Sequence, residues 1–279
     1  MPETLPRPPV GDRKMLERGR VRIEYFVSGE GDAVVLNPGF GRSVSDFNEL
    51  VPDLNDAGYQ TVAVQPRDVG GTRSPFLPRP TLHDFAGDLA AVVQAEQPAS
   101  GRAHVLGRAF GARIARMFAG DYPDLVGAAI LMAVGGPIPP DRKMLRRYAL
   151  QTSGLVSAEK RRQVMEETLY AAGQRMPEHL DYRPTLRATF RQGAAVRRTR
   201  LEHWWSVGRA PVLVIHGECD RLTSPENARL LKKDFPDRVQ LLMLSDAGHA
   251  LMTEEPRLIE RAIVSFLDEH PLAGAGQEG

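Results

Sequence analysis

The chain has 279 residues, 42% of them hydrophobic and 25% charged, and a formal net charge of +1. This length suits one large domain with a substantial core, and the balanced charge gives no footprint for nucleic acid. The single cysteine, Cys219, excludes an internal disulfide and a zinc site built from thiolates.

The beginning of the chain is rich in proline and polar residues, unlike a secretory signal, and no apolar run is long enough to span a bilayer. We therefore expect a cytoplasmic protein that binds neither membranes nor nucleic acid. Residues 1–19 are interpreted as an N-terminal tail and residues 271–279 as a C-terminal tail. The sequence leaves the oligomeric state open.

The first structural elements alternate between strand and helix. Residues 20–28 place apolar residues at every second position, which predicts a half-buried strand near a sheet edge. Residues 33–36 form a short apolar run that leads into Asn-Pro-Gly-Phe-Gly, typical of a buried strand before a tight loop. A helix is predicted from about Asp46 to Gly58, and the next strand over residues 59–64.

The same alternation continues for another two strands. Thr81 can cap a helix that carries apolar residues on one face. Residues 103–106 then form a strand, followed by a helix to about Gly120 and a strand over residues 126–134. This order predicts an α/β fold with a mostly parallel sheet covered by helices on both faces.

The alternation stops at Gly135-Gly136-Pro137 and resumes only after Gly208. The intervening residues have helical patterns and no convincing strand. Later elements are a strand over 211–216, a helix over 226–235, a strand over 239–244 and a last helix opening near Thr253. The prediction is a core made of residues 20–136 and 209–270, with residues 137–208 inserted as a helical cap before the penultimate strand.

The segment from His104 to Arg113 has the pattern of a nucleophile elbow, in which a strand turns sharply into a helix through G-x-S-x-G. Gly107 and Gly111 fit the crowded backbone of such a turn. The central position, which should carry the nucleophile, is Ala109. A tight turn without this ancestry would explain the segment alone, but later residues argue against that interpretation.

Two further segments complete the pattern of a catalytic triad. Asp220 follows the strand at 211–216, and His249 follows the strand at 239–244. Nucleophile position, acid and histidine therefore occur in the chain order of the α/β-hydrolases. Asp246 and Glu218 are alternative acids that fit the motif less well.

Over residues 21–267 the chain resembles the α/β-hydrolase superfamily, and its Gly-Arg-Ala-Phe-Gly elbow resembles those of some bacterial members with Ala at this position. The resemblance implies the α/β-hydrolase fold and an oxyanion hole formed by the backbone N–H groups of Phe40 and Phe110. Pro38 stands where the family commonly has His, but the donors are backbone groups and do not depend on it. Residues 65–74 resemble a structural loop of the family and receive no catalytic role.

Ala109 removes the covalent acyl-enzyme route, because a methyl group cannot attack a carbonyl carbon. Three interpretations remain open. His249 and Asp220 could act as a general-base dyad, activating water or abstracting a substrate proton in lyase- or oxygenase-type chemistry. The protein could instead be a non-catalytic receptor or scaffold, or an esterase-like serine hydrolase whose serine has been replaced. Retention of both dyad residues favours the first.

The expected partner is a small-molecule substrate or ligand, in a pocket that includes Gly39 and Arg108. Trp204 and Trp205 are further pocket candidates, although packing of the cap onto the core would also explain them. The cap has an excess of Lys and Arg, which a solvated surface explains and which inward-pointing arginines binding a carboxylate or phosphate would also explain. Metal-ligand clusters, phosphate loops and dinucleotide fingerprints are absent from the sequence, so no metal or cofactor is expected.

Overall fold

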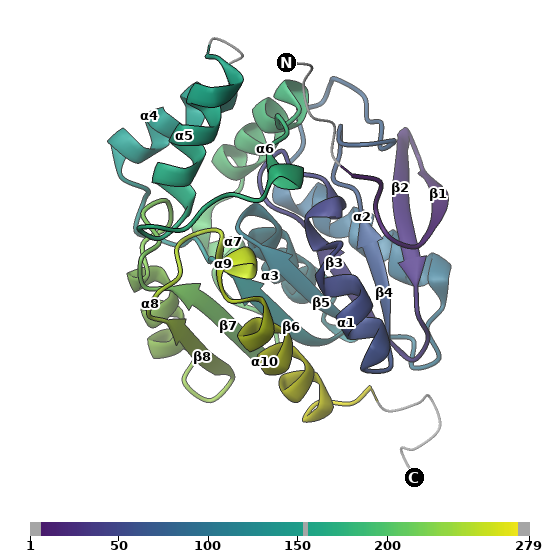
Figure 1. Cartoon of the computed structure of the whole chain (residues 1–279). Coiled ribbons are helices and arrows are strands. Elements are labelled where there is room, and N and C mark those ends of the chain that lie inside the picture. The colour runs from purple at the N-terminus through teal and green to yellow at the C-terminus, as the bar shows by residue number, and fades with distance from the viewer. Residues whose placement is uncertain (1–6, 153–155, 273–279) are drawn as a thin grey trace.

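The computed structural model describes residues 7–152 and 156–272. Within them, eight strands form one sheet in the order β1-β2-β4-β3-β5-β6-β7-β8 (Figure 1). Strands β3 to β8 are mutually parallel, whereas β2 runs antiparallel to both β1 and β4. The strands are β1 Asp12–Arg18, β2 Val21–Ser28, β3 Asp32–Asn37, β4 Tyr59–Val64, β5 Ala103–Arg108, β6 Val126–Met132, β7 Val212–Gly217 and β8 Val239–Leu244.

Helices cover both faces of this sheet. Helices α1 and α10 lie on the face toward the viewer in Figure 1, and α2 and α3 lie behind it. The α-helices are α1 Leu50–Asp56, α2 Leu82–Glu96, α3 Phe110–Asp121, α4 Arg142–Thr152, α5 Ala158–Leu169, α6 Leu186–Arg198, α7 Leu201–Trp204, α8 Glu226–Asp234, α9 Leu251–Glu254 and α10 Pro256–Asp268. The short 3-10 helices are η1 Val44–Phe47, η2 Pro123–Leu125 and η3 Glu178–Leu180.

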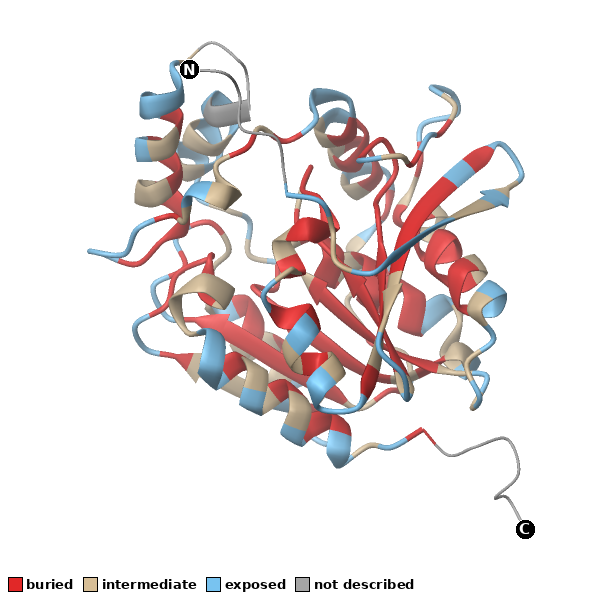
Figure 2. Cartoon of the chain, turned by 45° about the vertical axis from the view of Figure 1, so that its right-hand side comes forward, coloured by how far each residue is buried: buried red, intermediate tan, exposed pale blue. Residues whose placement is uncertain are grey.

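Burial on both faces explains the apolar strands. In β3, Val34 and Leu36 face the cluster under α1 and α10, while Ala33 and Val35 face the cluster under α2 and α3. Every residue of β7 is buried. Figure 2 shows the result as a red sheet between helices that are blue only on their outer sides. Strands enclosed in this way need apolar residues at successive positions, and this requirement made them recognisable in the sequence.

The predicted fold class is confirmed: the chain has a mostly parallel sheet flanked by helices, with helices α4 to α7 inserted between β6 and the penultimate strand β7. The predicted helix from Asp46 to Gly58 is divided into η1 and α1. Helix α2 begins directly after Thr81, as predicted, and the Asp84 carboxylate accepts hydrogen bonds from the Thr81 N–H and hydroxyl. In the described part of the chain, none of the helices combines the length and apolarity needed to cross a lipid bilayer.

The prediction of residues 1–19 as a tail is wrong for Asp12–Arg18, which form the edge strand β1. This strand pairs with β2 along its whole length, and the turn places Gly19 at a φ of 57°. Five of its seven residues are charged and most are exposed. Leu16 packs against the core, and Lys14 and Arg18 pair with Glu96 and Asp88 of α2. The strand is nevertheless too rich in charged residues to show an alternation of apolar and polar positions, so its sequence gave no strand signal.

Candidate active site

The turn between β5 and α3 has the geometry of a nucleophile elbow. Ala109 adopts a φ of 53° and a ψ of −104°, a conformation that L-residues rarely occupy. A Cβ atom at Gly111 would collide with the Asn37 carbonyl, and one at Gly107 would collide with the Gly111 backbone. Both glycines are therefore required by close backbone approach. The strained turn persists although its central side chain is a methyl group.

The acid and the histidine meet as the motifs predict. His249 Nδ1 lies 2.8 Å from Asp220 Oδ2, and both side chains are almost fully buried. An ionised carboxylate can only accept, so Nδ1 carries the proton and Nε2 keeps its lone pair. The alternative acids are elsewhere: Glu218 pairs with Arg229 at the surface, and Asp246 is exposed.

Two side chains from β7 and the loop after it fix the Asp220 carboxylate. Thr223 Oγ1 donates to Oδ2 at 2.6 Å, and the Leu222 and Thr223 N–H groups donate to Oδ1 at 2.8 Å each. His216 Nδ1 accepts from the Val134 N–H, so Nε2 carries a proton; it lies 3.1 Å from the Thr223 carbonyl and 3.4 Å from Asp220 Oδ2. Burial by itself raises the pKa of Asp220, but His249 and these donors outweigh it and hold the pKa well below its ordinary value. The carboxylate is thus ionised and fixed in orientation.

A cavity lies between this site and the inserted helices. Its wall includes Ala109, His249, Gly39 and Arg108, which places both of these predicted pocket residues beside the elbow. Phe40 also lines the cavity, whereas the Phe110 ring is buried in the core against Phe85. The rest of the wall combines polar side chains, among them Tyr148, Tyr170 and Thr253, with apolar ones. The apolar residues include Met165, Leu169, Met176, Leu180, Ala250 and Met252.

Trp204 and Trp205 do not line this cavity, so their prediction as pocket residues is wrong. The Trp204 ring packs under the guanidinium groups of Arg113 and Arg116, at 5.3 and 4.7 Å from the ring centroid. Trp205 also stacks with Arg116 and donates from Nε1 to Asp234. Both rings join α7 to α3 behind the elbow, because α7 folds back onto the sheet side of the insertion.

A buried polar cluster contributes Arg42 and Asp46 to the cavity wall. Arg42 makes a two-point ion pair with Asp46, both contacts at 2.8 Å, and the Tyr182 hydroxyl donates to Asp46 Oδ1 at 2.6 Å. The Arg42 guanidinium also stacks on the Tyr182 ring at 3.7 Å. Burial raises the pKa of Asp46, but the Arg42 charge and hydrogen bonds reverse the effect and hold it below its ordinary value. The pair therefore remains ionised and joins the core to the insertion.

The insertion also contacts the histidine loop directly. The Leu169 carbonyl accepts from the Ala250 N–H at 2.8 Å. The Glu254 carboxylate accepts from the Gly248 N–H at 2.8 Å and from the Ala171 N–H at 2.6 Å. One carboxylate therefore bridges the residue before His249 and the end of α5.

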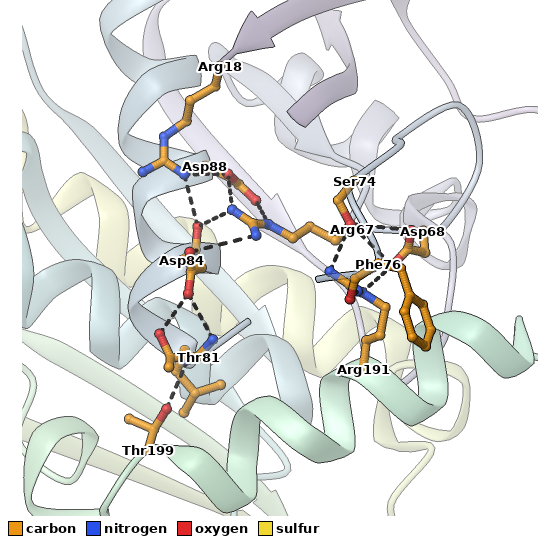
Figure 3. Close-up of polar contacts among 11 residues, drawn as sticks. Arg18, Arg67, Asp68, Ser74, Phe76, Thr81, Asp84, Asp88, Arg191 and Thr199 are labelled. Carbon is orange, nitrogen blue, oxygen red and sulfur yellow. Dashed lines mark hydrogen bonds and ion pairs between the residues drawn. The ribbon is translucent and has the colours of Figure 1, made fainter. Parts of the chain in front are cut away.

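On the opposite side, α6 is joined to the loop after β4 by buried charges. Figure 3 shows Arg191 reaching Asp68, Ser74 and the Phe76 carbonyl. Arg191 Nε lies 2.8 Å from Asp68 Oδ2, and the two side chains are only 1% and 3% exposed. The same figure shows Arg67 bound at two points to Asp88. The loop over residues 65–74 is thus structural, in agreement with the absence of any catalytic assignment.

Several site residues were not recognised in the sequence: His216, Thr223, Arg42, Asp46 and Tyr182. His216 stands four residues before Asp220 at the end of a buried strand, and this spacing was an available signal. Arg42, Asp46 and Tyr182 are common polar residue types whose meeting depends on the path of the insertion. Within residues 7–152 and 156–272, no three His, Cys, Asp or Glu side chains gather as metal ligands.

Comparisons with known proteins agree with this geometry. The family model described as serine aminopeptidase, S33, matches residues 30–256. A protein named "Putative non-heme bromoperoxidase BpoC" from Mycobacterium tuberculosis is 26% identical, over 88% of this chain and 97% of that protein. The 2-(acetamidomethylene)succinate hydrolase of Mesorhizobium japonicum is 24% identical, over 91% of this chain and 95% of that protein.

Solved structures show the same fold. The enol-lactonase from Burkholderia xenovorans LB400 superposes with a TM-score of 0.77 at 18% identity, covering 91% of this chain and all of that one. With its matched span and its architecture, the chain belongs to the serine aminopeptidase S33 family of the α/β-hydrolase superfamily.

Proposed function

We propose that this protein is an enzyme that transforms a small organic substrate by general-base catalysis, with His249 as the base and Asp220 as its orienting acid. The observation that carries the proposal is the His249–Asp220 hydrogen bond, maintained at the wall of a cavity whose elbow has no nucleophile. Ligand binding alone does not require an ionised Asp220 that is held by three hydrogen bonds besides the one from His249. A general base does require it, because Asp220 fixes the tautomer of His249.

In the reaction that we favour, a water molecule replaces the missing serine. His249 Nε2 takes a proton from the water as the oxygen attacks a carbonyl carbon of the substrate. The backbone N–H groups of Phe40 and Phe110 stabilise the resulting oxyanion, and the imidazolium then returns the proton to the leaving group. The similarity to the 2-(acetamidomethylene)succinate hydrolase of Mesorhizobium japonicum, which is named for hydrolysis of a small molecule, supports hydrolysis over other uses of the same base.

The same base could abstract a proton from the substrate itself. That variant of the proposal needs the same Nε2 lone pair and the same oxyanion donors, because the carbanion formed would place its charge on a carbonyl oxygen. Hydrolysis and proton abstraction are separated by the product: only hydrolysis incorporates an oxygen atom from solvent water.

The test is turnover of a panel of small esters, amides and lactones by the wild type and by His249→Ala, Asp220→Asn and Ala109→Ser. We expect His249→Ala to lower kcat by roughly 100-fold or more, and Asp220→Asn to do the same by allowing the wrong tautomer. His83→Ala removes a partly exposed histidine outside the cavity and serves as the control. In heavy-oxygen water, the product should carry one solvent oxygen.

Three results would contradict the proposal. Turnover unaffected by His249→Ala would exclude this base. Complete inertness of the wild type, with strong activity and an acyl-enzyme in Ala109→Ser, would indicate instead a serine-hydrolase site that has lost its nucleophile. Inertness of both proteins with ligand binding retained would identify a receptor.

A further inference from the structure

Arg108, the residue before the elbow alanine, has hydrogen-bonding capacity that the protein does not use. Its side chain is 14% exposed and lines the cavity. Nη2 donates to the His249 carbonyl at 3.2 Å, while the buried Nε has no partner among the described residues. A guanidinium has five N–H donors, so a buried one with so few acceptors is ready to bind a further acceptor.

The nearest carboxylate does not satisfy Arg108. Asp46 Oδ2 lies 3.7 Å from Arg108 Nη1, beyond hydrogen-bonding distance. Asp46 is already engaged by Arg42 at both oxygens and by the Tyr182 hydroxyl. The Arg42–Asp46 pair is therefore complete in itself, and Arg108 is the cation of the cavity wall without a hydrogen-bonded anion among the described residues.

One further carboxylate, Glu254, interacts electrostatically with Arg108, but no hydrogen bond joins them among the described residues. Glu254 accepts instead from the Gly248 and Ala171 N–H groups. Its oxygens are therefore engaged elsewhere, and the unused donors of Arg108 stay available.

The position of Arg108 determines what it can bind. A Cβ atom on Gly39 would lie 3.8 Å from Arg108 Nη1 and 4.0 Å from the Ala109 methyl, so guanidinium and elbow share one end of the cavity. The cavity wall also includes the apolar side chains of Met165, Leu169, Met176 and Met252. An occupant that matches both the guanidinium and these apolar side chains has an anionic group and an apolar body.

We propose that Arg108 is a substrate-binding residue that pairs with a carboxylate, and that the substrates are small carboxylic acids with an apolar chain or ring. A planar carboxylate accepts two parallel hydrogen bonds from a guanidinium, and Arg108 has the unused donors for this pairing. Bound there, the substrate is held at the end of the cavity that also contains Ala109 and His249. That the bound carboxylic acid is a substrate rests on the proposed function, but its binding to Arg108 requires no turnover.

The test compares hexanoate with hexanamide, which has nearly the same shape and no charge. Binding is measured by titration calorimetry and by following the Arg108 Nε–H resonance in an arginine-detected nitrogen–proton spectrum. The wild type should bind hexanoate about 10- to 100-fold more tightly than hexanamide, the range expected for hydrogen bonds to a charged group. The Arg108 resonance should shift with hexanoate and stay nearly unchanged with hexanamide.

Arg108→Gln should reduce hexanoate affinity to that of hexanamide while leaving hexanamide affinity unchanged, which also shows that the cavity is intact. Arg146→Gln removes the same charge from an exposed position on α4 and is the matched control for long-range electrostatics. If Arg108→Gln does not fold, Arg108→Lys provides a second variant, with an intermediate loss because an ammonium cannot make the two parallel bonds.

Equal affinity of the wild type for hexanoate and hexanamide, or hexanoate binding that survives Arg108→Gln, would overturn the inference. The outcome is separable from that of the proposed function. His249→Ala should keep the hexanoate preference although it abolishes turnover, so selective binding without catalysis would refute the enzyme proposal alone. Conversely, turnover that depends on His249, together with equal affinity for hexanoate and hexanamide, would refute this inference alone.

Discussion

The two sides of the inserted segment are joined to the core in different ways. Helix α6 is fixed by buried ions: Arg191 pairs with Asp68, and the Gly41 N–H donates to Gln192 Oε1 at 2.7 Å. Helix α5 instead meets the core through methionine and leucine side chains and a few backbone hydrogen bonds near His249. Buried ion pairs demand one geometry, whereas apolar contacts tolerate small shifts. We therefore expect α6 to be held rigidly on the core, and α5, which forms the cavity wall beside His249, to tolerate small shifts.

Breaking the ion pair at α6 should have the largest effect on stability. Arg191→Met leaves the buried Asp68 with the more exposed Arg187 as its ion-pair partner and the Ser74 hydroxyl as a further donor. The free energy of unfolding should therefore fall by about 3 kcal/mol. Urea unfolding measures this loss. Arg187→Met removes a half-exposed partner of the same carboxylate and should cost less than about 1 kcal/mol. Equal losses in both variants would show that burial does not distinguish the two arginines.

Acidification should weaken the joint between η1 and the α5–α6 connection. Burial raises the pKa of Asp46, but the charge and hydrogen bonds of Arg42 lower it by more than burial raises it. The pKa in the folded protein therefore lies below the ordinary value. The carboxylate therefore contributes stability that is complete above its unfolded-state pKa of about 4 and is lost as the pH falls toward the lower folded-state pKa. The difference in unfolding free energy between wild type and Asp46→Asn should shrink from pH 6 to pH 3. A difference that grows on acidification would contradict the assignment.

A smaller and more local effect is expected from Glu254→Gln. The amide can accept through only one oxygen, so either the Gly248 or the Ala171 N–H loses its acceptor, at a cost of about 1 kcal/mol. Hydrogen–deuterium exchange should become faster at residues 169–171 and 248–250 while α6 is unchanged. Glu255→Gln makes the same substitution at the neighbouring position and is the control. Faster exchange throughout α6 would indicate that the two sides are not independent.

The smallest effect should follow Met165→Leu on α5. The two side chains have similar volumes, and the surrounding cluster is apolar, so unfolding free energy should change by less than about 1 kcal/mol. Ala195→Val on α6, a fully buried position, adds volume and should cost more. Thermal unfolding compares them. A larger loss at Met165 would mean that the α5 side is packed as tightly as α6.

The residues that sequence reasoning placed correctly are those that follow buried parallel strands. Ala109, Asp220 and His249 each come directly after such a strand, and the ends of parallel strands meet at one sheet edge. Their grouping therefore follows from chain order. Strand β1 was missed because it lies at the sheet edge with charged residues on both faces.

The contacts between the cap and the core could not be derived from the sequence in the same way. Arg42 donates a hydrogen bond to the Tyr182 carbonyl although the two residues are 140 positions apart in the sequence. Only the folded path of the insertion brings them together. The local sequence around Trp204 and Trp205 is compatible both with lining the cavity and with packing against α3. In the structure their rings pack against α3 because Arg113 and Arg116 of that helix stack on them.

The order of the strands has a consequence for self-association. One edge of the sheet is β1, whose charged residues oppose pairing with a strand of another molecule. The other edge is β8, Val239–Leu244, which has a single polar residue, Gln240, and no charge. Uncharged apolar edges are the ones at which foreign strands add to a sheet. The two edges of the sheet therefore differ in charge: the charges of β1 oppose pairing with a strand of another molecule, whereas β8 carries no charge that would oppose it.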